Sequence, residues 1–200
     1  MIEIDARLVK QLLRTQFPQW ADLPVEPVEK GGWDNRTFRL GDSMSVRLPS
    51  ALAYVAQVEK EHRWLPLLGR HLPLPIPVPV GLGAPGADYP WPWSIYGWLD
   101  GEPAHLDRAL DLRRFAADLG HFLVALRGID ASNGPAAGPH NFHRGGSLSI
   151  YDSETRRSIG TLAGEIDVTA VTEVWDSALE TSWQGRRCGF MATLPQPISW

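Results

Sequence analysis

Residues 28–63 constrain the fold most, because short extended segments separated by glycine-containing turns give way there to a helical period. Two extended segments, residues 28–30 and 37–40, flank a turn at residues 31–35. A third segment, residues 44–48, follows the Gly41-Asp42 turn. Extended segments joined by short Gly and Asp turns pair as antiparallel strands. The pattern therefore predicts a three-stranded meander followed by a helix, which is the beginning of an α+β fold.

The same stretch carries charges that would suit an anion. Arg47 stands in the middle of the third segment, and Glu59 and Glu61 lie in the helical pattern that follows. Backbone N–H groups at Gly31 and Gly32 could approach a polyphosphate, with the arginine binding it and an acid orienting the arginine. A surface hairpin with a solvated arginine explains these residues equally well, because a Gly-Gly pair alone is a weak phosphate signal.

The composition allows a folded chain and excludes an electrostatic attraction to nucleic acid. The chain has 200 residues, of which 44% are hydrophobic, so it can build a core as one domain or two small lobes. A net charge of −4 and a pI near 5.8 give no basic surface of the kind that binds nucleic acid.

Cysteine usage and hydropathy predict a cytoplasmic protein. The single cysteine, Cys188, excludes an intramolecular disulfide and suits a reducing compartment. The first ten residues lack the basic start and apolar run of a signal peptide. No run of 18 apolar residues occurs, so we expect no membrane span.

Two helices are expected around the meander. Asp5 can cap the first, whose apolar face consists of Leu8, Leu12 and Leu13, and residues 18–27 then form a linker. The second covers residues 54–68. Its His62 is interpreted as a packed helix residue rather than a ligand.

Residues 72–83 carry proline at alternate positions before a glycine-rich end. Each proline lacks a backbone donor, so this segment is extended and cannot be a central strand. It could bind a partner as a polyproline ligand, but the intervening apolar residues are more typical of buried anchors.

An aromatic strand is expected at residues 93–99, before the Asp100-Gly101 turn. Its aromatic side chains can form core, and they can also form an apolar slot for a nucleobase. Backbone groups near residues 96–98 would then read the edge of the base. The two roles are compatible.

From Asp107 onward the pattern is helical. One helix is expected to run to Arg127, and two shorter ones cover residues 153–162 and 168–179. In the loop between them His140 and His143 have no nearby third ligand, so we predict no metal site. The chain therefore divides into a strand-rich lobe, residues 1–99, and a helical lobe, residues 100–187.

These segments, in this order, resemble the aminoglycoside phosphotransferase family. The resemblance covers roughly residues 5–187 and is carried by GGWDNRTFRL, SVRLP with EKEHRWLPLL, LPLPIPVPVGLG, WSIYGWLDGE and RGGSLSIYD. It implies a protein-kinase-like fold, with an antiparallel-sheet lobe followed by an all-helical lobe that is incomplete here. It also implies transfer of the γ-phosphate of ATP or GTP, with Mg²⁺, to a hydroxyl of a small molecule such as an aminoglycoside.

The resemblance also implies roles for residues at matching positions. The glycines would cover the nucleotide phosphates, and an arginine would replace the usual third-strand lysine, which keeps the charge but changes the reach. A helix acid would orient this arginine, with Glu59 as the fallback, and the hinge at residues 96–98 would hold the base. The binding residues are thus Gly31, Gly32, Arg47, Glu61, Tyr96 and Trp98.

The family's catalytic His-Gly-Asp loop, the Asn five residues later and the metal-binding Asp do not occur where they are expected, after residue 185. Phosphoryl transfer depends on such groups, so we assign no catalytic residue and no metal ligand. Synonymous codons for Phe190, Met191 and Ala192, read in a shifted frame, give His-Gly-Asp, and Pro197 with the residue after it gives the Asn. We therefore expect that the residues from about Cys188, 188–200, are an out-of-frame tail.

Such a chain is expected to have little or no transferase activity. The alternative is a non-catalytic module that binds a nucleotide or a protein partner. Loss of the later segments would also leave Phe122, Trp175 and Leu179 partly unpacked, and an exposed apolar surface of that kind predicts self-association.

Overall fold

The computed structural model describes residues 3–29, 32–101 and 111–182. The chain divides after Ile129 into two compact units, which are considered separately. The sequence predicts a different division, near residue 99, between a strand-rich lobe and a helical lobe. That division into functional lobes stays a prediction. Within the described residues, no helix is long and apolar enough to span a membrane.

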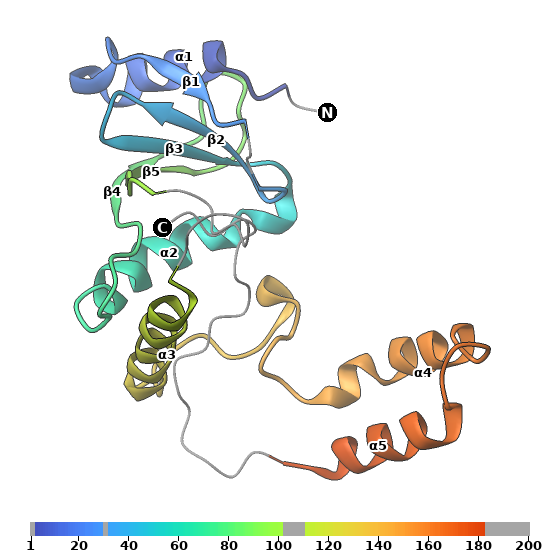
Figure 1. Cartoon of the computed structure of the whole chain (residues 1–200). Coiled ribbons are helices and arrows are strands. Elements are labelled where there is room, and N and C mark those ends of the chain that lie inside the picture. The colour runs from blue at the N-terminus through green and yellow to red at the C-terminus, as the bar shows by residue number, and fades with distance from the viewer. Residues whose placement is uncertain (1–2, 30–31, 102–110, 183–200) are drawn as a thin grey trace. The chain divides into compact units, whose positions relative to one another are not determined.

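The first unit is built on a five-stranded antiparallel sheet with the order β1-β2-β3-β5-β4 (Figure 1). The strands are β1 (Val25–Pro27), β2 (Asn35–Leu40), β3 (Met44–Pro49), β4 (Pro79–Gly83) and β5 (Trp93–Gly97). A meander is present as β1, β2 and β3, with its second and third strands where they were predicted and its first strand before the predicted residues 28–30. Gly41 adopts a φ of +55° in the β2–β3 turn, a conformation that glycine reaches without steric strain.

Helix α1 (Ala6–Gln16) covers one face of this sheet. The Asp5 carboxylate accepts a hydrogen bond from the Leu8 amide at 2.8 Å, so the helix begins where the sequence predicts. Leucine and valine at helical spacing meet the alternate apolar residues of the strands, and the residues of this core are 0–8% exposed. They are Leu8, Val9, Leu12, Leu13, Val25, Phe38, Leu40, Val46, Leu48, Tyr89, Trp93 and Ile95.

Two glycines of β4 make room for aromatic rings on this apolar face. A Cβ at Gly83 would lie 2.0 Å from the Trp93 ring, and one at Gly81 would lie 3.0 Å from the Phe17 ring. Phe17 and Trp93 pack edge to face with ring centroids 5.4 Å apart. The small residues of the edge strand therefore allow two large rings to complete the core.

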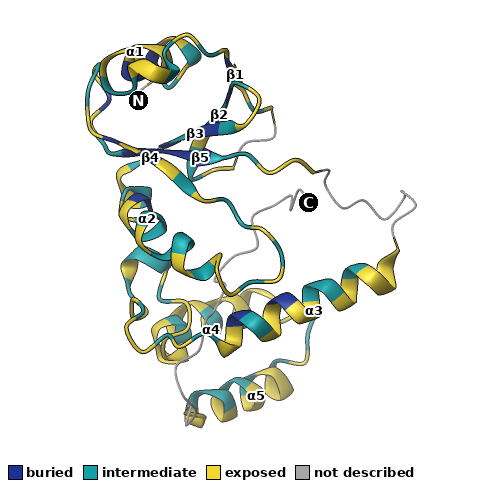
Figure 2. Ribbon diagram, turned by 90° about the vertical axis from the view of Figure 1, so that its left-hand side faces the viewer, coloured by how far each residue is buried: buried dark blue, intermediate teal, exposed yellow. Residues whose placement is uncertain are grey.

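Helix α2 (Ala56–Leu68) lies on the opposite side of the sheet from α1 (Figures 1 and 2). A 3₁₀ turn, η2 (Leu52–Tyr54), precedes it, and Pro66 lies inside its last turn. Only Val58 of this helix is buried. The helix thus faces the sheet mainly through polar and half-buried side chains.

The remaining helix of the first unit is α3 (Leu112–Gly128). The Asp111 carboxylate caps it by accepting from the amides of Arg113 and Arg114. Phe122 is 2% exposed, so the expectation that it is unpacked is wrong. Its helical spacing from Leu126, also buried, identifies one covered side of α3.

The second unit contains α4 (Asp152–Thr161) and α5 (Val168–Glu180), preceded by the short turns η3 (Pro139–Asn141) and η4 (Leu148–Tyr151). Both predicted helices are present. They are joined by polar contacts: Trp175 Nε1 donates to Asp152 at 2.8 Å, and Arg156 pairs with Asp152 and Asp176. Exposed residues dominate both helices in Figure 2.

The first predicted strand is displaced in the structure. The ladder begins at Val25, within the predicted linker, rather than at residue 28, because Val25 pairs with Leu40 and enters the core at 7% exposure. Val28 keeps only a hydrogen bond from its amide to the Thr37 carbonyl, at 3.0 Å. The burial of a single valine therefore sets the position of this strand.

Candidate functional site

The face of the sheet away from α1 is polar. Side chains alternate along a strand, so the residues between the buried apolar ones point the other way, toward the side where α2 lies. Three strands contribute to this surface, which we call the polar face: Thr37 and Arg39 of β2, Ser45 and Arg47 of β3, and Ser94 and Tyr96 of β5.

Arg47 and Glu61 meet on the polar face. Arg47 Nη1 lies 3.8 Å from Glu61 Oε2, and 34% and 25% of these side chains remain exposed. Glu59, the fallback partner, is exposed on α2. The separation exceeds a hydrogen-bond distance, so Glu61 attracts and orients the guanidinium without closing around its donors.

Tyr96 contacts both members of this pair. Its hydroxyl donates to Glu61 Oε2 at 2.5 Å, and the Arg47 guanidinium carbon lies 4.9 Å from the centre of its ring. Burial, and then the charge and hydrogen bond of Glu61, raise the pKa of Tyr96 well above its ordinary value. The phenol therefore stays protonated and acts as a donor at neutral pH.

A second contact ties α2 to β5. His62 Nε2 and Ser94 Oγ form a hydrogen bond of 3.0 Å, and Ser94 is 1% exposed. Burial lowers the pKa of His62, and the neighbouring Glu61 opposes that shift. His62 is thus a packed helix residue, as the sequence indicates.

The glycine turn lies between β1 and β2. Gly32 is exposed, and no atom would come within 4 Å of a Cβ placed there, whereas Gly31 lies outside the described residues. Ser50 fixes the end of the turn, because its hydroxyl donates to the Trp33 carbonyl at 2.6 Å and its amide to the Asp34 carbonyl at 2.9 Å. Gly32 is therefore open to solvent, close to the end of the turn that Ser50 anchors.

The predicted hinge, residues 96–98, covers the end of β5 and the residue after it. The amides of Gly97 and Trp98 donate to the carbonyls of Val78 and Ser43, at 2.9 and 2.8 Å. These two donors are engaged by protein, so a base edge read at this point would have to use other backbone groups. The role of the hinge in binding a base stays a prediction.

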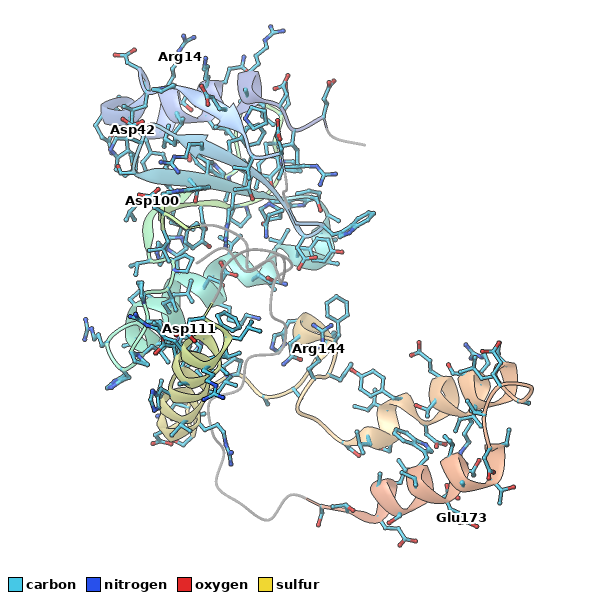
Figure 3. The ribbon with its side chains drawn as sticks, in the orientation of Figure 1. Arg14, Asp42, Asp100, Asp111, Arg144 and Glu173 are labelled. Carbon is cyan, nitrogen blue, oxygen red and sulfur yellow. The ribbon has the colours of Figure 1, made fainter. Side chains whose placement is uncertain are left out.

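Arg39 connects the hinge to the β2–β3 turn. Its guanidinium carbon lies 4.1 Å from the centre of the Trp98 ring, and it donates to the Asp42 carbonyl and lies 3.8 Å from the Asp100 carboxylate. Asp42 and Asp100 lie at the same end of the sheet (Figure 3). A depression of about 370 Å³ opens there, lined by Pro24, Glu26, Arg39, Gly41, Asp42 and Trp98.

The search for a metal site covers the described residues alone. No three His, Cys, Asp or Glu side chains gather among them in a way that could hold a metal ion. The predicted tail and the position expected for the catalytic loop lie outside the described residues.

The structure brings Arg47 and Glu61 together, a choice between Glu61 and Glu59 that the sequence left open. The sequence missed two contacts of α2. Tyr96 was expected to hold a base as part of the hinge, which stays a prediction, and the bond from its hydroxyl to Glu61 was not foreseen. Ser94 was not singled out, although it shares a hydrogen bond with His62. Both depend on how α2 crosses β5, and nothing in the local sequence specifies that crossing.

Residues 25–188 match a family model described as the phosphotransferase enzyme family. No curated protein sequence matches the chain significantly. Three solved structures illustrate the fold. The GDP complex of wild-type aminoglycoside 2'-phosphotransferase-IIIa is 17% identical, with a TM-score of 0.61, over 88% of this chain and 58% of that one.

The other two are a streptomycin–ATP–APH(2")-IIa ternary complex and the macrolide 2'-phosphotransferase MphH from Brachybacterium faecium as apoenzyme. Each is 18% identical with a TM-score of 0.53, and they match 90% and 91% of this chain. This chain spans 60% and 63% of their lengths. At these identities the likeness establishes the protein-kinase-like fold.

Proposed function

Because the chain belongs to the phosphotransferase enzyme family, we propose that the polar face of its sheet binds the polyphosphate of ATP or GTP. Arg47 would bind the phosphate oxygens, Glu61 would orient Arg47, and the backbone at Gly31 and Gly32 would cover the phosphates. The base would lie against the hinge, with Trp98 beside it. This binding function belongs to residues 1–99.

The ion pair of Arg47 and Glu61 is the observation that supports this function. The arginine is oriented by one carboxylate at 3.8 Å, and a third of its side chain is exposed. A guanidinium in that state retains N–H donors, and their planar arrangement matches phosphate oxygens. Structures with the same fold include complexes named for GDP and for ATP.

The reaction of the family would be transfer of the γ-phosphate to a hydroxyl of a small molecule, and an aminoglycoside is the first substrate class to test. His-Gly-Asp does not occur among these 200 residues. A group that accepts the hydroxyl proton is needed for efficient transfer. We therefore expect the 200-residue chain to bind nucleotide and to turn over little or none.

A thermal-shift titration with ATP and GTP, each with and without MgCl₂, tests binding. A ligand that binds only the folded state stabilises it by about 2.7 kcal/mol at 100 times its Kd. A rise in Tm that saturates with nucleotide supports the proposal. An unchanged Tm at millimolar concentrations of both nucleotides, together with no heat of binding in calorimetry, would contradict it.

A coupled kinase assay with a panel of aminoglycosides tests turnover separately. We expect a rate close to that of a control without protein. Robust phosphate transfer by the 200-residue chain would refute the expected inactivity while supporting the kinase lineage. Binding without turnover matches the non-catalytic alternative as a description of this chain.

A further inference from the structure

Tyr96 is fixed more firmly than either partner that it contacts. It lies in β5, paired with Ser45 of β3 on one side and with Pro79 of β4 on the other. Its side chain is buried, at 2% exposure. Arg47 and Glu61 are both partly exposed, and Glu61 is on a helix rather than in the sheet. The phenol is therefore the rigid reference point of the group.

The same oxygen of the Glu61 carboxylate lies next to both Tyr96 and Arg47. Glu61 Oε2 accepts the Tyr96 hydroxyl at 2.5 Å, and the same atom is the one 3.8 Å from Arg47. An arginine and a carboxylate that are free to approach usually close to about 2.7–2.9 Å, often through two hydrogen bonds. Here the shorter contact is made by the phenol, and the longer one by the guanidinium.

The tyrosine ring also limits where the guanidinium can move. Its centre lies 4.9 Å from the guanidinium carbon, within the range of a cation–π contact. The ring therefore supports Arg47 from one direction while the hydroxyl holds the acid. Both contacts leave the arginine N–H donors without a close carboxylate from the part of the chain that the structure describes.

We propose that Tyr96 is a positioning residue, which holds Glu61 at a distance where the acid orients Arg47 but does not occupy its donors, so that they stay available for phosphate. This role rests on the phosphate-binding function proposed above. Without the hydroxyl, Glu61 would close onto Arg47, and an incoming phosphate would have to displace it.

The variant Tyr96→Phe removes the hydroxyl and keeps the ring and backbone. We expect its affinity for ATP, GTP and inorganic tripolyphosphate to fall about tenfold, the scale of one hydrogen bond to a charged group. Affinity for the nucleosides adenosine and guanosine should not change, because they carry no phosphate. If Tyr96→Phe folds poorly, Tyr96→Met removes the same hydroxyl.

Tyr89→Phe is the matched control. Tyr89 is also a buried tyrosine, 1% exposed, but it belongs to the apolar core and its hydroxyl donates to the Pro49 carbonyl at 2.8 Å. The Tyr89→Phe variant loses a buried hydroxyl and leaves the residues of the polar face unchanged. Tyr89→Phe should therefore leave polyphosphate affinity unchanged.

A double variant tests whether Tyr96 acts through Glu61. In the Glu61→Gln background no carboxylate can close onto Arg47, so adding Tyr96→Phe should change affinity by less than about twofold. An equal loss from Tyr96→Phe in both backgrounds would assign the effect to general packing and overturn the proposal.

Arginine modification gives a reading that does not require nucleotide. Phenylglyoxal labelling of Arg47, followed by mass spectrometry, should be slower in Tyr96→Phe than in the unchanged chain, and Glu61→Gln should restore the rate. If slowing occurs and no polyphosphate binds, the proposed function fails and the positioning role stands. If nucleotide binds but Tyr96→Phe alters neither labelling nor affinity, the positioning role fails alone.

Discussion

The two faces of the five-stranded sheet differ in the polarity of their side chains. Toward α1 the strands present apolar side chains that are almost fully buried, and leucine and valine side chains of the helix pack against them. Toward α2 the same strands present serine, arginine and tyrosine, and one glutamate and one histidine of the helix make polar contacts with them. Burying the apolar face accounts for stability, at about 25 cal/mol per Å² of apolar surface.

The polar face is poorly explained by stability alone. Its ion pair is long and partly exposed, and such pairs contribute about 0–1 kcal/mol. A sheet of this size could bury more apolar surface on that side if stability were the only requirement. This difference is expected if one face holds the fold together and the other serves the nucleotide binding proposed above.

Truncating a leucine in each helix should give the largest difference between the two faces, measured as a change in the free energy of unfolding. Leu13 of α1 is 0% exposed, and Leu67 of α2 is 45% exposed. We expect Leu13→Ala to lower the free energy of unfolding by about 3 kcal/mol, and Leu67→Ala by less than about 0.5 kcal/mol. Urea denaturation measures both, and similar losses would show that the two faces are not distinct.

The reverse pattern is expected for charge. Arg47→Gln should weaken ATP or GTP binding by about 2 kcal/mol, roughly thirtyfold, because a charge-assisted contact to phosphate is lost. Arg36→Gln is the control, since Arg36 is in the same sheet but on the other side of β2, and is exposed. Calorimetric titration compares them, and equal losses would remove Arg47 from the proposed site.

A smaller effect should separate the two helix acids. Glu61→Gln removes the charge that orients Arg47 and should cost about 1 kcal/mol of nucleotide binding, roughly fivefold. Glu59→Gln removes the same charge from an exposed position of α2 and should have no measurable effect on binding. The same titration decides between them, and a larger loss from Glu59→Gln would reverse the assignment.

The smallest expected effect concerns pH and the attachment of α2. Burial holds the pKa of folded His62 below its ordinary value of 6.5, and Glu61 opposes this shift, beside the Tyr96 ring 6.3 Å away. As pH falls below 6.5 the unfolded chain takes up this proton first, so stability decreases until the folded pKa is passed. Tm measured from pH 7.5 to 5 should fall slightly more steeply for the unchanged chain than for His62→Gln, and parallel profiles would argue against this linkage.

Sequence periodicity predicted most of the apolar face. Leu8, Leu12 and Leu13 share one side of a helix, and the residues of β2 and β3 alternate, so their partners follow from geometry. The residue range of α2 was also close. The start of the sheet at Val25 was not predicted, because a three-residue strand beside two prolines has too weak a local pattern.

The polar face was predictable only in part. The local pattern put Arg47 opposite an acid of the next helix, and the resemblance to a family preferred Glu61 to Glu59. The hydrogen bond from Tyr96 to Glu61 requires the angle and position of α2 against β5, which depend on tertiary packing. Predictions for Gly31 and for the residues from 188 onward fall outside the described residues and stay predictions.

The prolines at and before the edge strand β4 affect how readily the protein associates with itself at high concentration. Strand β4 is at the rim of the sheet, and its Val80 and Leu82 are about half exposed. An open rim of that kind invites a neighbouring molecule to add a strand. Pro75, Pro77 and Pro79 have no amide hydrogen to offer, so any such addition must stop at the start of the strand. The three prolines thus limit the addition of further strands at an edge where apolar side chains are exposed to solvent.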